Sequence, residues 1–388
     1  MLKCIEKNLV SCILILFFFF DVVNFFQSRY SELVISNTVS IFWKGFVEVA
    51  ILAYLLYTRN HRNILYIIIC FIFIPLIWYF EYLFIATPEK LFLSIVKIIR
   101  DVNKFIFPVV LFLFVKSYPY QKINSSLKVF EGLYLIMATI VVVAFLFDLP
   151  LLYTYGANRF GFTPPFAGRN EITLFWIIGI IYLYSRCRST LSYKYYGMLF
   201  LVSFASLLLG TKAVLLFHFC FVIYLFLFEF KLKPFNKLSI ISIVILGIIS
   251  FAVFSGIVDF FLVISKEHGV LTGLTSKRNL LFIHDFLPIT KGWHWWNFLW
   301  GGCFKDKFPI VEMDIFDLFL MVGIIGVIGY FYLIFNTLFK FNAKNKLAWF
   351  FVSQFVILGA LAGHVYASGI NAIWLALLCV FLHRVEQS

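Results

Sequence analysis

The hydrophobic residues of this chain come in long continuous runs. Two of these runs read LVSCILILFFFF, ending at Phe20, and ILYIIICFIFIPLIWYF, beginning at Ile64. Runs of this length are typical of transmembrane helices, because in hydrocarbon a helix satisfies every backbone N–H and C=O within its own segment. An outer-membrane barrel would instead alternate apolar and polar residues. The pattern therefore predicts an all-α, polytopic integral membrane protein.

The runs predict about twelve transmembrane helices within a single transmembrane domain, residues 1–388. We place them near 9–26, 39–57, 64–85, 91–115, 130–147, 171–185, 196–210, 213–229, 238–264, 314–338, 347–365 and 369–383. At the N-terminus, Lys3 and Lys7 precede an apolar run, as in a signal peptide. However, Asp21 interrupts the run and no small-residue cleavage site follows, which favours an uncleaved first helix.

Composition agrees with this class. Hydrophobic residues make up 63% of the chain and charged residues only 13%, too few to give a water-soluble domain its polar surface. The seven cysteines form no CxxC pair and lie mostly within the apolar runs, so we expect neither a zinc site nor a disulfide framework.

The distribution of cations predicts the orientation. Short connectors rich in Lys and Arg and poor in acids are typical of the cytoplasmic side. One alternate set of connectors has this composition: 1–8, 58–63, 116–128, 185–195, 230–237, 339–346 and 384–388. Both termini are therefore expected in the cytoplasm. The net charge of +13 is not accompanied by a nucleic-acid-binding motif, so nucleic acid is not expected as a partner.

Two connectors on the opposite side are long, near 148–170 and 265–313, and both are rich in Gly and Pro. Long loops in compact proteins are usually functional, so we expect the active site here. In the first loop, Arg159 and Arg169 carry planar guanidinium groups suited to phosphate, and Asn170 begins the next helix. The alternative is an interfacial loop whose arginines contact lipid head groups.

Further candidates follow along the chain. Lys212 stands between two apolar runs and either reaches the outer interface or lines a polar cavity. The second long loop contains adjacent Lys277 and Arg278, and then Trp295 in a tryptophan-rich stretch. Such aromatics form either a belt at the membrane interface or a stacking surface for sugar rings.

Acidic residues enter a helix at its outer end as Glu312, Asp314 and Asp317. Asp314 and Asp317 are one turn apart on the same helical face, so at least one is expected to point into the bundle. His364 lies at the end of an apolar run, and histidine is the residue type that ordinarily titrates near neutral pH, although a histidine at a membrane edge is more often a packed residue.

No Walker A loop, GxSxG elbow or HExxH motif is present, which argues against an ATP-driven pump, a serine hydrolase or a zinc protease.

In their order and sidedness, these motifs resemble the O-antigen polymerase and O-antigen ligase superfamily of bacterial envelope proteins. The resemblance covers about 158–371 well and the first half only by hydropathy. One residue separates Arg159 from Gly161, where the family pattern has two. The residues that carry the resemblance are, in chain order, Arg159, Gly161, Asn170, Gly210, Thr211, Lys212, Ser276, Arg278, Glu312, Asp314, Gly323, Gly326, Gly363 and His364.

The resemblance implies a metal-independent glycosyltransferase of the C type in the bacterial inner membrane, with no cofactor. It implies undecaprenyl-diphosphate-linked glycans as donor and acceptor, a membrane lipid environment and a chain-length regulator protein as a further partner. We expect catalytic roles for Arg159 and Arg278, with His364 or Glu312 as the base. Substrate contacts are expected from Arg169, Asn170, Lys212, Lys277, Asp314 and Trp295.

The expected reaction is polymerisation of lipid-linked repeat units at the periplasmic face. A ligase that transfers the polymer to lipid A-core would use the same donor. A flippase or transporter would favour charges deep in several spans together with internal symmetry. Asp21, Lys44, Glu48 and Glu81 do lie within predicted spans, but most ionisable candidates gather on one outer side, which favours chemistry there.

Overall fold

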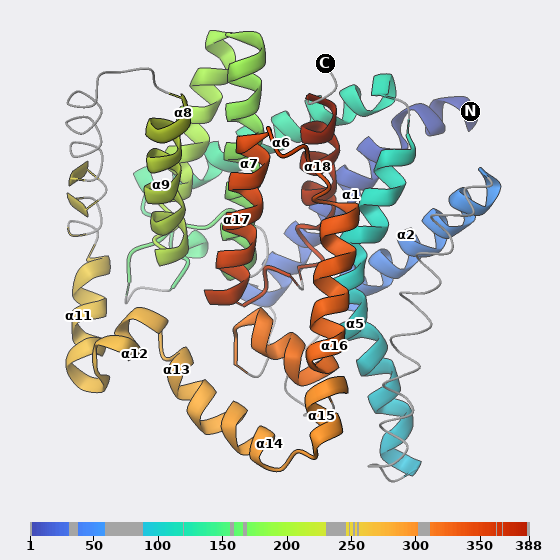
Figure 1. Ribbon diagram of the computed structural model, residues 1–388. Coiled ribbons are helices and arrows are strands. Elements are labelled where there is room, and N and C mark those ends of the chain that lie inside the picture. The colour runs from blue at the N-terminus through green and yellow to red at the C-terminus, as the bar shows by residue number, and fades with distance from the viewer. Residues whose placement is uncertain are drawn as a thin grey trace. The chain divides into compact units, whose positions relative to one another are not determined.

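The computed structural model describes residues 2–30, 38–58, 88–118, 120–155, 159–165, 169–229, 246–247, 249–250, 253, 256–301, 311–361, 363–366 and 368–385 (Figure 1). Regular structure in these ranges is helical, and the only β-type pairing described in them is an isolated bridge between Tyr153 and Phe162. The all-α prediction is confirmed for this part of the chain. The expected span 64–85 and about half of the span 238–264 lie outside it.

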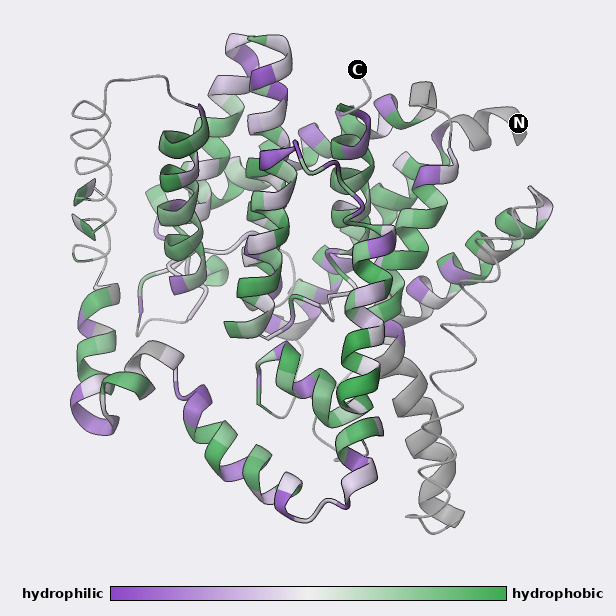
Figure 2. Cartoon of the chain, in the orientation of Figure 1, coloured by the Kyte–Doolittle hydropathy of each residue, from purple (hydrophilic) through white to green (hydrophobic). Residues whose placement is uncertain are grey.

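Four described helical segments are long and apolar enough to cross a membrane. They are Asn8–Gln27, Ile123–Leu146, Lys212–Glu229 and Asp314–Thr337. Figure 2 shows hydrophobic residues along most of α9, which forms the first part of the third segment. The length and composition of these segments indicate a membrane-embedded protein. The count of twelve spans stays a prediction.

The chain divides into two compact units, which are described separately here. Unit 1 comprises Met1–Phe130, Leu280–Lys340 and Gly359–Ser388. Unit 2 comprises Glu131–Asn279 and Phe341–Leu358. The described helices before residue 150 are α1 (Leu2–Tyr30), α2 (Thr38–Tyr57), α5 (Pro88–Ser117) and α6 (Tyr120–Leu146). Those from 150 to 229 are η2 (Pro150–Leu152), α7 (Arg169–Thr190), α8 (Tyr193–Leu207), α9 (Lys212–Tyr224) and η4 (Leu225–Glu229).

The region 265–313, expected as a long loop, is largely helical where it is described. α11 (Ile257–His268) leads into a succession of short helices, which Figure 1 shows in yellow to orange. These are α12 (Val270–Thr275), α13 (Arg278–Leu281), η5 (Phe282–Phe286), α14 (Leu287–Lys291) and α15 (Trp295–Trp300). The C-terminal helices are α16 (Asp314–Thr337), α17 (Lys346–Leu361) and α18 (Ala372–Val385).

In unit 1, α18 packs most extensively against α5. Every residue of α18 from Ala372 to Leu382 is buried, which explains why this helix is apolar on all sides. Polar contacts between helices of this unit add specificity. The Ser11 and Ser126 hydroxyls are 2.9 Å apart, and the Lys44 ammonium lies 3.9 Å from the buried Asp21 carboxylate.

A close crossing joins α15 to α16 in unit 1. Gly323 lies inside α16 with φ 62° and ψ −172°, so the helix is kinked there. A Cβ at Gly323 would overlap the backbone of Leu299 and Trp300, and a Cβ at Gly301 would overlap that of Met321. Only glycines allow the two backbones to approach this closely.

In unit 2, α7 packs against α8 and α9. Tyr134 of α6 stacks on Phe175 with ring centroids 4.2 Å apart, and its hydroxyl donates to the Phe175 carbonyl at 2.6 Å. At the other end of α7, the buried Glu131 accepts hydrogen bonds from Tyr182 at 2.8 Å and Tyr195 at 3.1 Å. The Arg186 guanidinium lies 3.4 Å from the same carboxylate, so the buried charge is compensated.

Candidate functional site

The segment around residues 159–163 and the turn before α9 pack directly on each other in unit 2. The Phe162 N–H donates to the Leu208 carbonyl at 2.8 Å, which aligns the two segments. The Arg159 guanidinium donates to the Gly210 carbonyl at 2.7 Å. Two motifs that are about fifty residues apart in sequence are therefore adjacent in the fold.

Glycine is required on both sides of this contact. A Cβ at Gly161 would lie 2.6 Å from the Leu209 carbonyl oxygen, and one at Gly210 would overlap the Phe160 carbonyl. Gly210 also has φ +69°, a conformation that disfavours other residues. Thr211 then caps α9, because its hydroxyl accepts from the Val214 N–H at 3.4 Å.

Two cations of this region share one aromatic ring. The Lys212 ammonium lies 3.4 Å from the centroid of Phe261, and the Arg159 guanidinium carbon lies 5.3 Å from it. Arg159 also stacks over Tyr155 at 3.9 Å. Lys212 donates to the Gly273 carbonyl of α12. The electron-rich faces of the aromatic rings and the backbone carbonyl oxygens attract both positive charges and so fix their positions.

Arg278 is close enough to Lys212 to repel its charge, as is Arg159. Arg278 is the first residue of α13 and is half-buried. Its neighbours Ser276 and Lys277 both have positive φ, 55° and 68°, and the Lys277 side chain is exposed. We refer to Arg159, Lys212 and Arg278 as the cation cluster.

The cation cluster lies at the N-terminus of α9, because Lys212 is the first residue of that helix. Like charges repel one another, and the helix N-terminus adds further positive potential. An anion placed among the three side chains would relieve this repulsion. Guanidinium groups bind phosphate oxygens in a bidentate geometry, so the arrangement is chemically suited to a phosphate or diphosphate.

Three residues expected to bind substrate, Arg169, Asn170 and Trp295, are not part of the cation cluster. Arg169 and Asn170 begin α7, but their side chains are outside the described part of the chain. Trp295 begins α15 in unit 1 and is 71% exposed, with its ring in edge contact with Trp296 at 5.9 Å. An exposed indole suits either an interface belt or a sugar platform, so both interpretations of Trp295 stay open.

The second group of candidates lies in unit 1, around the start of α16. The helical spacing predicted that at least one of Asp314 and Asp317 points into the bundle, and both are buried, at 3% and 1% exposure. Asp314 accepts backbone N–H bonds from His364, Val365 and Tyr366, each at 2.6 Å. Asp317 accepts from the Val311 and Met313 amides at 2.9 and 3.2 Å. These contacts give both carboxylates a positioning role.

The hydrogen bond from the His364 amide to Asp314 holds His364 close to Glu312, which lies two residues before Asp314. A Cβ at Gly363 would lie 2.8 Å from the Glu312 carbonyl oxygen, so the two backbones touch there. Both Glu312 and His364 have positive φ, 57° and 68°. Non-glycine residues in this conformation cluster at functional sites, because the surrounding structure must hold them there. The Glu312 side chain is exposed, and that of His364 is half-exposed.

Tyr366 is a further ionisable group beside Asp314. Burial raises the pKa of the Tyr366 phenol above its ordinary value, and the negative charge of Asp314 acts in the same direction. The phenol therefore stays protonated at neutral pH. Of the groups around this turn, Glu312 and His364 remain the candidate proton acceptors.

Sequence reasoning missed the aromatic and backbone partners of the cation cluster. Phe261 carries no distinguishing signal in a chain with 52 phenylalanines. Gly273 and Tyr155 were not singled out either.

Among the described residues, no group of three His, Cys, Asp or Glu side chains is arranged to hold a metal ion. No family model, curated protein or solved structure matches the chain.

Proposed function

We propose that this protein is a polysaccharide polymerase of the inner membrane. It transfers a growing glycan from undecaprenyl diphosphate to a lipid-linked repeat unit at the periplasmic face. The observation that carries this proposal is that Arg159 and Lys212 meet beside Phe261 at the N-terminus of α9, with Arg278 close enough for its charge to act on Lys212. These residues come from three motifs of the family resemblance.

The chemistry explains why such a cluster is useful. The bond between the anomeric carbon and the phosphate oxygen breaks, and negative charge builds on the departing undecaprenyl diphosphate. Cations fixed around the leaving group stabilise this charge more in the transition state than in the ground state. The contact of Lys212 with Gly273 and that of Arg159 with Gly210 would hold the two cations without reorganisation.

The acceptor hydroxyl forms the new bond to the anomeric carbon and gives up its proton to a base. Glu312 and His364 are the candidates, supported by their adjacency and by their left-handed backbone conformations. In this proposal Asp314 acts through His364, because its carboxylate fixes the backbone of the 364–366 turn. Asp314, expected to contact substrate, is therefore proposed as a positioning residue.

A gene deletion followed by analysis of the surface glycan tests the proposal. The deletion strain carries either the wild-type gene or an Arg159→Ala copy, and lipopolysaccharide is separated on a gel. A single repeat unit on the lipid core, restored to a ladder by the wild-type copy, supports a polymerase. A bare core with lipid-linked polymer accumulating would identify a ligase. An unchanged ladder in the deletion strain would overturn both assignments.

A further inference from the structure

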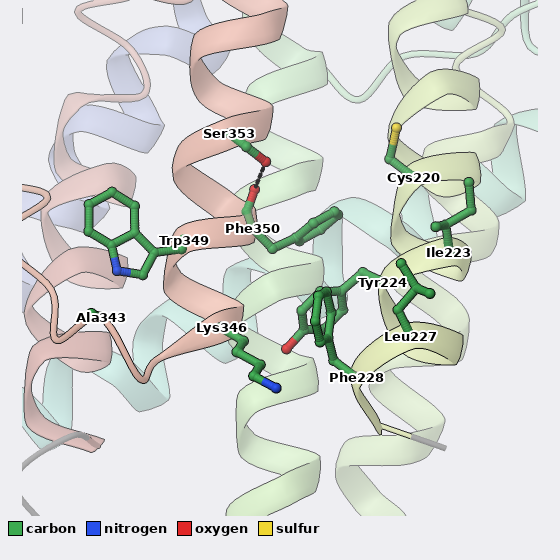
Figure 3. A pocket seen from close by; sticks show the side chains of 10 residues that line it. All are labelled: Cys220, Ile223, Tyr224, Leu227, Phe228, Ala343, Lys346, Trp349, Phe350 and Ser353. Atoms are coloured by element: carbon green, nitrogen blue, oxygen red, sulfur yellow. Dashed lines mark hydrogen bonds between the residues drawn. The ribbon is translucent and has the colours of Figure 1, made fainter. Parts of the chain in front are cut away.

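A groove in unit 2 lies between α9 with its extension η4 on one side and α17 on the other (Figure 3). Its volume is about 430 Å³, within the range of roughly 300–1,000 Å³ typical of small-molecule sites. Both helices are apolar along their length, and Lys212–Glu229 is long enough to cross a membrane. In a membrane-embedded protein, walls of this composition are suited to contact with lipid hydrocarbon.

The walls are aromatic and aliphatic. The Tyr224 and Phe350 rings stack on each other with centroids 4.7 Å apart, and both line the groove (Figure 3). Leu227 and Phe228 remain 66% and 51% exposed beside them. Both belong to η4, a single π-helical turn. Such turns are rare, and they occur frequently at functional sites.

One end of the groove is positively charged. The Lys346 side chain is exposed, and its ammonium lies 4.7 Å from the Phe228 ring. The neighbouring Glu229 carboxylate is held by the Arg188 guanidinium at 3.0 Å and by the Tyr224 hydroxyl at 2.9 Å. The charge of Glu229 is therefore balanced locally, and Lys346 leaves this end cationic.

The same end has the features of a membrane interface. The Trp349 indole N–H donates to the Asn342 carbonyl at 3.1 Å, while its ring lines the groove. A tryptophan whose ring contacts apolar groups and whose N–H is hydrogen-bonded is typical of the membrane–water interface, where the lipid head groups lie. A ligand in this groove thus has its polar end beside Lys346 and its apolar part among Leu227, Phe228 and Phe350.

We propose that this groove binds an anionic phospholipid, with the phosphate at Lys346 and an acyl chain against the aromatic wall. The positive charge of Lys346 favours a lipid with an anionic head group over a zwitterionic lipid, which could cover any apolar face. The proposal concerns neither the cation cluster nor glycan transfer, and it holds whether or not the proposed polymerase activity is correct.

Purified full-length protein in detergent is mixed with equal amounts of phosphatidylglycerol and phosphatidylcholine, and bound lipid is counted by native mass spectrometry. We expect the wild type to retain phosphatidylglycerol preferentially and Lys346→Gln to lower that preference about fivefold, the effect of one cation near a lipid surface. Lys128→Gln, which removes an exposed lysine elsewhere, is expected to leave the preference unchanged.

Filling the groove tests the acyl-chain half of the proposal. Ser353 lines the groove and is exposed, so Ser353→Phe adds a ring there without disturbing the core. This variant is expected to lose binding of both lipids, while glycerol phosphate alone does not displace lipid from the wild type. Equal retention of the two lipids by the wild type would overturn the proposal. An unchanged preference in Lys346→Gln would do the same.

Discussion

Arg159 makes two contacts through one guanidinium group. Its guanidinium donates to the Gly210 carbonyl at 2.7 Å and stacks over Tyr155 at 3.9 Å. A guanidinium carries five N–H donors in a planar fork, the geometry that bidentate binding of phosphate uses. Arg159 therefore belongs both to the loop contact and to the proposed diphosphate site, and substitutions must separate the two roles.

Arg159→Ala is expected to reduce glycan transfer about a hundredfold, which corresponds to about 3 kcal/mol of lost transition-state stabilisation. Arg159→Lys should recover only a small part of the rate, since a point charge lacks the bidentate geometry. Polymer formation is measured in membranes containing equal amounts of protein. Arg29→Ala is the matched control, because Arg29 is also stacked, 5.3 Å above Phe25. Full-length polymer from Arg159→Ala would remove this residue from the mechanism.

Glu312 and His364 can be distinguished by substitutions that keep size and hydrogen bonding. Glutamine at either position cannot accept a proton near neutral pH. If His364 is the base, His364→Gln loses turnover yet still binds the lipid-linked donor, while Glu312→Gln stays partly active. The measurement is donor binding and transfer rate for each purified variant. The reverse pattern would assign the role to Glu312, and normal rates in both would exclude both residues.

At the scale of elements, α16 illustrates what a sequence pattern conveys and what it omits. The apolar run near 314–338 predicted a helix, and the structure has one from Asp314 to Thr337. The pattern did not reveal the kink at Gly323, because the kink depends on contact with the backbone of Leu299 and Trp300. The helical nature of 265–301 was also missed, since its helices are short and its Gly and Pro content is typical of loops.

The glycines of α16 allow a test with an internal control. Gly323→Ala places a Cβ against the α15 backbone at positive φ, so we expect destabilisation of at least about 1–2 kcal/mol. Gly329 lies in the same helix with open space around its Cβ position. Gly329→Ala should therefore be neutral or stabilising, by up to about 1 kcal/mol. Thermal unfolding in detergent compares the two, and equal midpoints would contradict the proposed crossing.

At the scale of the whole molecule, hydropathy predicts where helices lie but not which motifs meet. The composition and the apolar runs were sufficient for the all-α membrane class. The contact between Arg159 and Gly210 was not foreseeable, because it rests on backbone approach at Gly161 and Gly210. Phe261, which organises two cations, looks like any other phenylalanine in the sequence. The chemistry of the site residues and their resemblance to a family pattern are visible in the sequence, whereas their partners are visible only in the fold.

Topology is a prediction for the complete chain. We expect 58–63, 116–128, 185–195 and 230–237 in the cytoplasm and both long outer connectors in the periplasm, because of the distribution of Lys and Arg. Alkaline phosphatase fused after Lys277 should be active, and the same enzyme fused after Ser192 should be inactive. Activity from the Ser192 fusion would reverse the orientation and place the cation cluster on the side opposite to the proposed chemistry.

The Asp314 carboxylate occupies a nest of three consecutive amides, at residues 364–366, so the protein supplies its own anion there. Asp314→Ala leaves this nest vacant and its buried N–H groups unsatisfied, which is expected to lower the melting temperature by several degrees. A small carboxylate such as formate should then enter the vacancy and restore part of the loss, as a chemical rescue. The same formate concentration should hardly affect the wild type, and an identical response in both proteins would contradict this view of the turn.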